Sequence, residues 1–544
     1  MSASVRDRMT PSAIGTFEWA ALVAAFVILV IFRLHAFDLP LETDECNYAV
    51  IAARMLGGDR LYVDVWDHQP FGIFVLFAAV IGVFGDSPPV FRWMALAFSA
   101  VSLLLIFGIL RLMGGRNAAI LGAILFSLGS SDPGTAGEGC NREIYMNTFI
   151  LAAWYFTAKS DERRNLWLLA AGAVLAIASS LKTIAAVHWG CLALWIVVSE
   201  ARATRPTTAI TQRLAWFALG PTLFWGAALG YFAISGRFGE FAEAVFLFNV
   251  GYTESGEPFF MRFMRFFAPV RHQFIFDSAL PLWIAAGIGS IWLIVEIVVR
   301  RDRRDFAMLL LLLASFVAIC LPGRFWPHYY YLMLPALVLV VSLMTARFAS
   351  WIGGILSLKK RGSVLVQALA YLPIPIALTV TEGRDYLFQP SFGITVKRYN
   401  SRDFWGRAQG HNIASVTNPE DSIFVFGNDA SLYYYSRRSC ASRYTMITGL
   451  SQGMHGAEQR RETLVRELRA ELPRLVVVLF DEAPFEEWKA FLRENYGEPV
   501  GWDYHDEKGE PIMFVLGQKD RPIPSIDWNW DRSIVGGWSR GERR

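Results

Sequence analysis

The sequence is poor in charged residues. Aspartate, glutamate, lysine and arginine make up 18% of the 544 residues, whereas soluble globular domains carry about 25% on average. Hydrophobic residues make up 54% of the chain. Such a composition indicates a chain built largely for lipid, so its length does not translate into several soluble domains. The net charge of +3 is too small to indicate a nucleic-acid partner.

Cysteine is also scarce, and the sequence lacks internal repeats and long low-complexity segments. The five cysteines show no CxxC spacing of the kind used for zinc or redox chemistry. Cys191 and Cys320 lie in apolar runs and are interpreted as membrane-core residues. Cys46 and Cys140 fall in predicted outer loops, where a disulfide is one alternative and two free thiols are the favoured one.

Long apolar runs are what the chain has in abundance. A membrane span needs about 20 mostly apolar residues. The first run, which follows a short basic start, is interpreted as an uncleaved span because no small-residue cleavage site follows it. Eleven runs qualify as spans: 17–37, 88–112, 117–133, 144–159, 165–181, 184–201, 214–234, 279–299, 305–321, 329–347 and 363–381.

Residues 71–85 form a further apolar run of about 15 residues, a length more typical of an interfacial or re-entrant helix. If this run does not cross, every short basic segment falls on one side, which the positive-inside rule assigns to the cytoplasm. The sequence therefore predicts a bacterial-type inner (plasma) membrane protein with a cytoplasmic amino terminus and a periplasmic or extracellular carboxy terminus. The basic segments are Arg6/Arg8, Arg111/Arg116, Lys159/Arg163/Arg164, Arg202/Arg205/Arg213, Arg300/Arg301/Arg303/Arg304 and Arg347/Lys359/Lys360/Arg361.

Three larger pieces then face outward: the first loop, 38–87; the loop 236–277, with an aromatic and basic segment typical of an interfacial helix; and the tail. We expect a transmembrane domain over 1–381, with the first loop as its catalytic part, and an extracytoplasmic α/β domain over 382–544. Asp503 and His505 of this tail are interpreted as surface residues. The expected strands are 422–426, 474–480 and 512–517, and the expected helices lie near 457–471 and 484–495.

The densest acidic feature near the outer face follows the first span. Asp44 and Glu45 are adjacent there, and in a helix their side chains would point about 100° apart. Asp44 is suited to be a general base, because a carboxylate can accept the proton of an attacking hydroxyl. The structural alternative is that Asp44 only caps the helix that follows.

Two further outer loops carry ionisable residues near membrane depth, where such groups are functional hypotheses by default. Glu143 sits where its loop meets the fourth span. It is either a cavity-lining acid or, as the sequence alone favours, a partner of Arg142 or a charge at the lipid interface. Lys182, at the outer end of the fifth span, either binds a phosphate as a point charge or extends its ammonium to the interface.

The loop before the tenth span offers a cation, an imidazole and a phenol together. These groups, Arg324, His328 and Tyr329, suit a phosphate head group. The alternative is an aromatic belt at the interface, which explains the tyrosine better than it explains the arginine and the histidine.

Taken in order, these motifs resemble those of the C-type (GT-C) membrane glycosyltransferases, and most closely the dolichyl-phosphate-mannose protein mannosyltransferases and the lipid A aminoarabinose transferases. The resemblance covers roughly residues 17–350 and is most specific in the first loop. Gln69 departs from the family pattern, because it stands where the first of two prolines is expected. The matching residues are Asp44-Glu45, Ala53-Arg54, Gly58 with Tyr62, and His68 in the first loop, then Glu143, Lys182, Arg324, His328, Tyr329 and Pro335.

The resemblance implies an α-helical polytopic GT-C fold and an inverting glycosyltransferase. The donor would be a polyprenyl-phosphate-linked sugar, and the acceptor an envelope glycan, lipid or protein. Asp44 would take the proton of the attacking hydroxyl, while Lys182 and Arg324 would stabilise the departing phosphate. No metal ligand set is complete, so no obligatory metal or other cofactor is expected, with a divalent metal left open.

Three other functions compete with this interpretation. A transporter or flippase of lipid-linked substrates would also need many spans, but it predicts repeats and broken helices in matching halves, which the sequence lacks. A lipid-linked glycan polymerase or ligase shares the donor type, but the Asp44-Glu45 pair directly after the first span argues against it. A purely structural scaffold is the third alternative.

Overall fold

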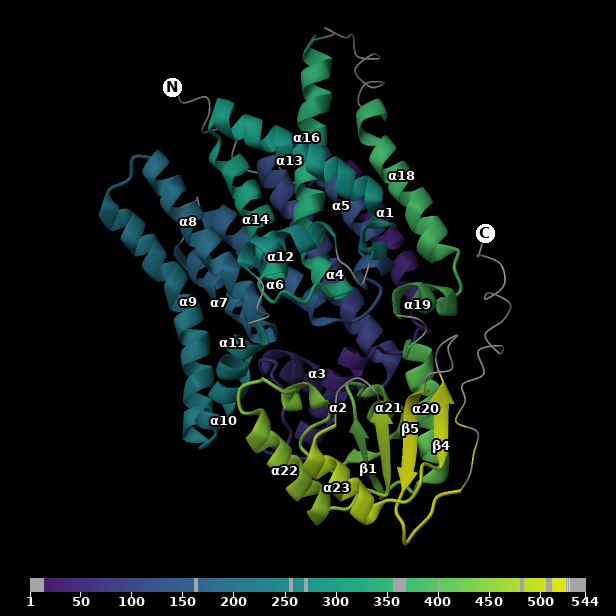
Figure 1. Ribbon diagram of the computed structural model, residues 1–544. Coiled ribbons are helices and arrows are strands. Elements are labelled where there is room, and N and C mark those ends of the chain that lie inside the picture. The colour runs from purple at the N-terminus through teal and green to yellow at the C-terminus, as the bar shows by residue number, and fades with distance from the viewer. Residues whose placement is uncertain are drawn as a thin grey trace. The chain divides into compact units, whose positions relative to one another are not determined.

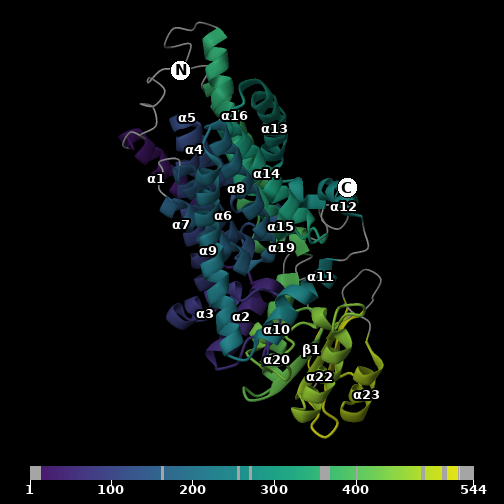
Figure 2. The ribbon, with the colours of Figure 1, turned by 90° about the vertical axis from the view of Figure 1, so that its left-hand side faces the viewer.

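The computed structural model describes residues 14–160, 165–253, 258–268, 273–355, 368–399, 402–479, 484–504, 511–524, 526 and 528. The chain is mostly helical and forms two compact units (Figures 1 and 2). Unit 1 comprises residues 1–37, 91–230 and 256–389. Unit 2 comprises residues 38–90, 231–255 and 390–544. The first loop and the tail, which are far apart in sequence, therefore belong to the same compact unit.

Unit 1 is a helical bundle made mainly of apolar helices. Buried leucine, alanine and phenylalanine side chains form its core, whereas the outward faces of α1, α9 and α13 carry exposed apolar side chains. Exposure of that kind suits helices in contact with lipid. The main helices are α1 (Thr16–Leu34), α4 (Pro88–Met113), α5 (Gly115–Gly129), α6 (Arg142–Lys159), α7 (Asn165–Leu181), α8 (Val187–Arg202), α9 (Thr207–Ile234), α12 (Phe259–Phe267), α13 (Leu280–Arg300), α14 (Arg303–Cys320), α15 (Pro327–Tyr330), α16 (Leu334–Ile355) and α18 (Pro373–Glu382).

Each of the eleven predicted apolar runs coincides with one of these helices, although part of the run 363–381 lies outside the described residues. Among the described residues, six helices are long and apolar enough to cross a membrane. The multi-pass helical architecture is therefore confirmed, and the number of eleven spans stays a prediction. Of the basic segments, Arg6, Arg8, Arg163, Arg164 and residues 359–361 also lie outside the described residues.

The two predicted interfacial segments both form short helices. Helix α3 (Gly72–Phe84) has 13 residues, which at 1.5 Å per residue is about 20 Å, against a hydrocarbon core about 30 Å thick. Helix α12 is shorter still and exposes Phe260, Met264 and Phe267. Both lengths agree with the interpretation that these segments do not cross the membrane.

Unit 2 contains a five-stranded mixed sheet in the order β2-β1-β3-β5-β4. Strand β1 (Ser422–Phe426) is parallel to β2 (Ser439–Cys440) and β3 (Leu475–Leu479), and β5 (Pro511–Gly517) is antiparallel to β3 and β4 (Gly501–Tyr504). Every residue of β1 and β3 is buried, as expected for unbroken apolar runs covered on both faces. The predicted α/β tail is thus confirmed.

Helices cover both faces of this sheet. Figures 1 and 2 show α22 (Ala457–Ala470) and α23 (Glu486–Asn495) on one face, and α20 (Arg402–Val416) on the other. Trp488 of α23 stacks on Phe426 of β1, with ring centroids 4.6 Å apart.

One expectation about the tail is wrong. Asp503 is buried, not on the surface, because its carboxylate accepts hydrogen bonds from Trp405 Nε1 (2.5 Å) and Gln409 Nε2 (2.8 Å) of α20. His505 lies outside the described residues.

The first loop forms a helical pair within unit 2. Helix α2 (Thr43–Leu56) packs against α3 on one side and against α21 (Ser431–Ser436) of the tail on another. The ring of Tyr48 contacts Phe74 and Phe77 of α3. The helix that carries Asp44 is therefore packed between an apolar helix and the α/β layer.

Candidate active site

In unit 1, three of the predicted site residues form one buried cluster. Lys182 Nζ donates a hydrogen bond to Glu143 Oε1 at 2.9 Å. The same ammonium lies over the ring of Tyr329, 3.2 Å from its centroid. Lys182, Glu143 and Tyr329 expose 6%, 0% and 4% of their surface. Burial at this level requires that the charges be paired, and the ion pair and the aromatic face meet that requirement.

Two more basic side chains border this cluster. Arg142 Nε lies 3.5 Å from Glu143 Oε1, so the predicted Arg142 partner of Glu143 is present alongside Lys182. His328 is close enough to Glu143 to interact with it electrostatically, and its ring packs on Tyr329 at 4.9 Å. Arg142 and Lys182 outnumber the single carboxylate, so these groups carry a net positive charge suited to an anion.

The ends of three helical segments position the cluster. Glu143 is the second residue of α6, where the helix dipole favours a carboxylate. Lys182 follows the last residue of α7 in an extended conformation, with φ −158°. Tyr329 belongs to α15 and precedes α16. Helix ends from three separate parts of the sequence thus converge within unit 1.

Arg324 occupies a different environment from the other candidate phosphate ligands. Its side chain is exposed, whereas Lys182, His328 and Tyr329 are buried. It lies between two residues with left-handed backbone, Gly323 (φ 65°) and Phe325 (φ 52°). The structure therefore brings Lys182, Glu143, His328 and Tyr329 together and sets Arg324 on the surface of the loop before α15.

Sequence reasoning missed Arg33, which fixes two of the segments that carry this cluster. Its buried guanidinium donates hydrogen bonds to the carbonyls of Ser130 (2.8 Å) and Gly139 (3.2 Å) and to the hydroxyl of Tyr331 (3.2 Å). It thereby ties the loop before α6 to the segment after Tyr329. A signal was available, because Arg33 is a basic residue at the predicted outer end of the first span, against the positive-inside pattern.

In unit 2, Asp44 is the second residue of α2 and is partly exposed. The N-cap is Glu42, so the alternative in which Asp44 only caps the helix is wrong. Glu45 is buried, and its carboxylate accepts a hydrogen bond from the Glu42 backbone N–H at 3.1 Å, as in a capping box. The two adjacent acids therefore differ: Glu45 secures the helix end, while Asp44 stands partly exposed beside it.

The other predicted residues of the first loop have partners that fix the loop's shape. Arg54 donates to Asp59 (2.6 Å) and to the carbonyls of Asp64 (2.8 Å) and Ser442 (2.9 Å). Tyr62 has a left-handed backbone, φ 72°, and its buried hydroxyl donates to the Gln69 carbonyl at 2.9 Å.

Burial, together with Asp67, raises the pKa of Tyr62, which keeps the phenol a neutral donor. His68 packs its ring on Phe248 and Tyr252 of α11 (Phe248–Thr253). Arg54, Tyr62 and His68 thus share a role in the architecture of the loop.

The tail also holds the start of α2, a relationship that the sequence did not reveal. The Ala430 backbone N–H donates to Thr43 Oγ1 at 3.0 Å. Thr445 Oγ1 donates to Asn47 Oδ1 at 2.6 Å, and Asn47 Nδ2 donates to Asp67 Oδ2 at 2.7 Å. Asp44 lies between Thr43 and Asn47 in sequence, so both of its flanks are fixed by contacts that include the tail.

The two predicted outer-loop cysteines, Cys46 and Cys140, are free thiols, and both are buried. The favoured alternative for them is thus confirmed.

Comparisons with known proteins agree with the predicted resemblance. A family model described as dolichyl-phosphate-mannose-protein mannosyltransferase matches residues 68–225, less than a third of the chain. The matched segment contains Glu143 and Lys182. Among curated proteins the sequence has no match.

Solved structures extend the similarity to nearly the whole chain. ArnT from Cupriavidus metallidurans, bound to undecaprenyl phosphate, is 16% identical with a TM-score of 0.59, and the match covers 92% of this chain and 98% of that one. The Archaeoglobus fulgidus oligosaccharyltransferase, tethered to an acceptor peptide, is 13% identical with a TM-score of 0.54, covering 93% of this chain and 74% of that one.

The oligosaccharyltransferase AglB from Archaeoglobus fulgidus, in complex with an inhibitory peptide and a dolichol-phosphate, is 12% identical with a TM-score of 0.53, and the match covers 94% of this chain and 75% of that one. At these identities the similarity is one of fold. The predicted GT-C fold is confirmed.

Proposed function

We propose that the protein is an inverting glycosyltransferase that moves a sugar from a polyprenyl-phosphate donor to an acceptor hydroxyl at the outer face of a bacterial-type inner membrane. The observation that carries the proposal is Asp44, a partly exposed carboxylate on a helix end that is fixed by capping and by the tail. The protein that carries Asp44 has the fold of ArnT, and the matched ArnT structure contains undecaprenyl phosphate. A second structure of similar fold, AglB, holds a dolichol-phosphate, which is a polyprenyl-phosphate lipid of the same class.

The reaction is a single in-line displacement. The acceptor hydroxyl attacks the anomeric carbon, Asp44 takes the hydroxyl proton, and the bond between the anomeric carbon and the phosphate oxygen breaks, with its electron pair leaving on the lipid phosphate. Attack from the face opposite the leaving group inverts the anomeric centre. Phosphate leaves readily, so the step requires little acid catalysis.

The phosphate-binding role falls to the cations of unit 1. Lys182, with Arg142 beside it, supplies buried positive charge, and a preorganised cation of this kind stabilises charge that develops as the bond breaks. His328, on the same cluster, offers a ring N–H to the phosphate. Arg324, exposed on its loop, would reach the phosphate from the solvent side. Because these cations neutralise the leaving group, the mechanism includes no obligatory metal.

The proposed orientation places the tail outside the cytoplasm. It rests on the basic segments, which all fall on one side if α3 does not cross, and on the 13-residue length of α3.

The test is a transfer assay with purified protein and a polyprenyl-phosphate sugar, paired with mass spectrometry of envelope lipids and glycans from cells with and without the protein. A glycan or lipid that loses one sugar residue in cells without the protein identifies both the sugar and the acceptor. Movement of the lipid-linked sugar across the bilayer without formation of a new glycosidic bond would instead support a transporter and overturn the proposal.

A further inference from the structure

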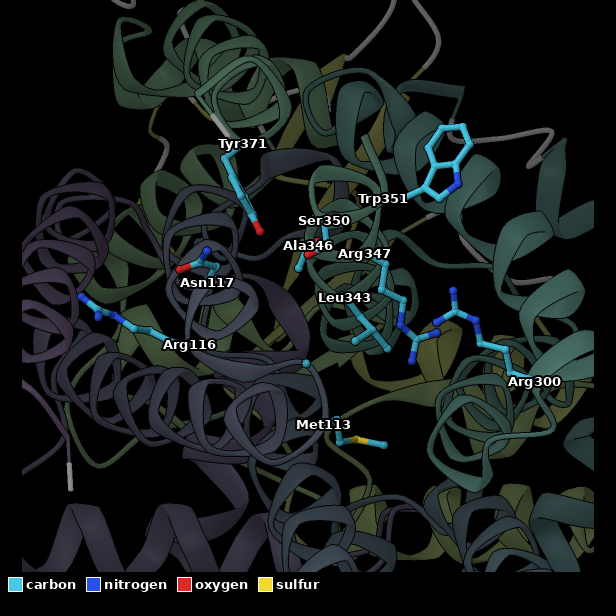
Figure 3. Close-up of a pocket in the computed structure, with 11 residues that line it drawn as sticks. Met113, Arg116, Asn117, Arg300, Leu343, Ala346, Arg347, Ser350, Trp351 and Tyr371 are labelled. Carbon is cyan, nitrogen blue, oxygen red and sulfur yellow. Dashed lines mark hydrogen bonds between the residues drawn. The ribbon is translucent and has the colours of Figure 1, made fainter. Parts of the chain in front are cut away.

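Unit 1 contains a cavity of 570 Å³ away from the residues assigned to the reaction. Figure 3 shows the side chains that line it. Arg347 and Trp351 belong to α16, Arg300 is the last residue of α13, and Arg116 is the second residue of α5. The remaining lining residues are Met113, Gly114, Asn117, Leu343, Ala346, Ser350 and Tyr371.

The cavity lies at the opposite end of unit 1 from the Glu143–Lys182–Tyr329 cluster. Tyr329 lies in α15, before α16 begins at Leu334, whereas Arg347 is far along α16. Thirteen residues separate Leu334 from Arg347, which is about 20 Å of helix. The cavity-lining arginines also belong to three of the basic segments that the positive-inside pattern assigns to the cytoplasm.

Ion pairs behind the cavity orient two of its arginines. Arg347 donates to both carboxylate oxygens of Asp305, at 2.5 and 2.9 Å, and Arg300 Nε lies 2.5 Å from Glu296 Oε2. A guanidinium has five N–H donors, so each arginine keeps donors beyond its carboxylate partner. Figure 3 shows Arg347 and Arg300 side by side, the Tyr371 hydroxyl pointing toward the Asn117 amide, and the Arg116 guanidinium directed away from the other lining side chains.

The surroundings of the cavity are amphipathic. Trp351 is 57% exposed, and the neighbouring surface of α13 and α16 exposes Val298, Val299 and Ile355. A polar, arginine-lined pocket that opens onto an apolar helix surface matches a molecule with an anionic head group and acyl chains. It suits a soluble anion less well, because the exposed apolar side chains would then have no partner.

We propose that this cavity binds the head group of an anionic phospholipid of the cytoplasmic leaflet, with the acyl chains along α13 and α16. Basic pockets between membrane helices on the cytoplasmic side are suited to such head groups, since the leaflet there is rich in anionic lipid. Arg300 and Arg347 contact the phosphate, and the amide of Asn117 donates to its oxygens. Arg116, whose guanidinium lies over the Phe17 ring, adds positive charge beside the cavity. This site is separate from the donor site of the proposed transferase.

The test measures lipid retention by native mass spectrometry of the full-length protein, exchanged into detergent with phosphatidylcholine and phosphatidylglycerol in equal amounts. The double variant Arg116→Gln/Arg300→Gln removes two cavity cations. Arg347 is left intact, because its loss would strand the fully buried carboxylate of Asp305. The charge-matched control is Arg202→Gln/Arg205→Gln, two exposed arginines of another predicted cytoplasmic segment that do not line the cavity.

The wild type and the control variant should retain phosphatidylglycerol in preference to phosphatidylcholine, and the cavity variant should bind it roughly 10- to 30-fold more weakly. Equal loss in both double variants would mean a diffuse charge effect and would overturn the proposal. So would equal retention of the two lipids by the wild type. Displacement of phosphatidylglycerol by millimolar inorganic phosphate would identify a free-phosphate site and reject the lipid.

Discussion

Thr445 of the tail donates a hydrogen bond to Asn47 of α2 across 398 residues of sequence, with 2.6 Å between the two oxygens. Asn47 in turn holds Asp67 of the first loop at 2.7 Å. The tail thus fixes Asn47, Asn47 fixes the first loop through Asp67, and both contacts fix the helix end that carries Asp44. The tail therefore takes part in positioning the proposed base.

Replacing Thr445 with valine tests this positioning role. The substitution preserves shape but removes the donor to Asn47, and a small displacement of α2 should lower kcat about 10-fold, since misplacement of a reacting group by about 1 Å can cost 10²-fold. KM for the donor should change little. Thr463→Val on α22 is the matched control, because the Thr463 hydroxyl accepts an exposed hydrogen bond from Arg466 on the same helix. Equal kcat in Thr445→Val and the wild type would contradict the role.

The proposed base is tested by the two adjacent acids of α2. Asp44→Asn should fold normally, keep its affinity for undecaprenyl phosphate, and lose about 10²-fold or more in transfer, the range expected for loss of a general base. Glu45→Gln is the matched control, because glutamine preserves the capping box and should leave both stability and transfer near normal. Near-normal transfer by a well-folded Asp44→Asn protein would remove the assignment.

The buried Lys182–Glu143 pair allows a structural role to be separated from phosphate binding. Lys182→Met alone leaves the Glu143 carboxylate buried beside one fewer cation and should destabilise the protein by about 3–5 kcal/mol. Adding Glu143→Gln removes the stranded charge and should recover most of the melting temperature.

The double variant should nevertheless bind undecaprenyl phosphate at least about 10-fold more weakly than the wild type, since a hydrogen bond to a charged group contributes about 1.5–3 kcal/mol. Affinity is measured by native mass spectrometry and stability by thermal unfolding in detergent. Wild-type affinity in a stable double variant would make Lys182 a structural residue only.

Much of the fold could be predicted because its signals are local. Strands β1 and β3 are unbroken apolar runs, and every predicted span coincides with a helix, since burial in lipid leaves a long apolar run in the sequence. Strand β4, with the sequence GWDY, has no such pattern and was missed. Asp503 within it was assigned to the surface because its partners on α20 are about a hundred residues away, and only the tertiary fold brings them together.

The candidate site shows the same limit. The individual residues Glu143, Lys182 and Tyr329 were identified from their place at the outer ends of spans. The pairing of Glu143 with Lys182 links two residues 39 positions apart and has no local signal. The membership of the first loop and the tail in one unit also depends on contacts such as Trp66 N to the Arg443 carbonyl at 2.9 Å. Such long-range pairs are decided by packing, which a single sequence does not reveal.

The topology is open to a direct test with reporter fusions. All short basic segments fall on one side only if α3 does not cross, and this places the tail outside the cytoplasm. Alkaline phosphatase fused after Gly393 should be active, because that enzyme needs an oxidising compartment to form its disulfides, and a fluorescent protein that matures only in the cytosol should be dark there. The matched control is the same pair of reporters after Arg205, between α8 and α9, where the opposite result is expected.

An inactive phosphatase and a bright reporter after Gly393 would mean an even number of spans. Lys182 and Asp44 would then face opposite sides of the membrane, and the proposed roles of base and phosphate ligand could not serve one reaction.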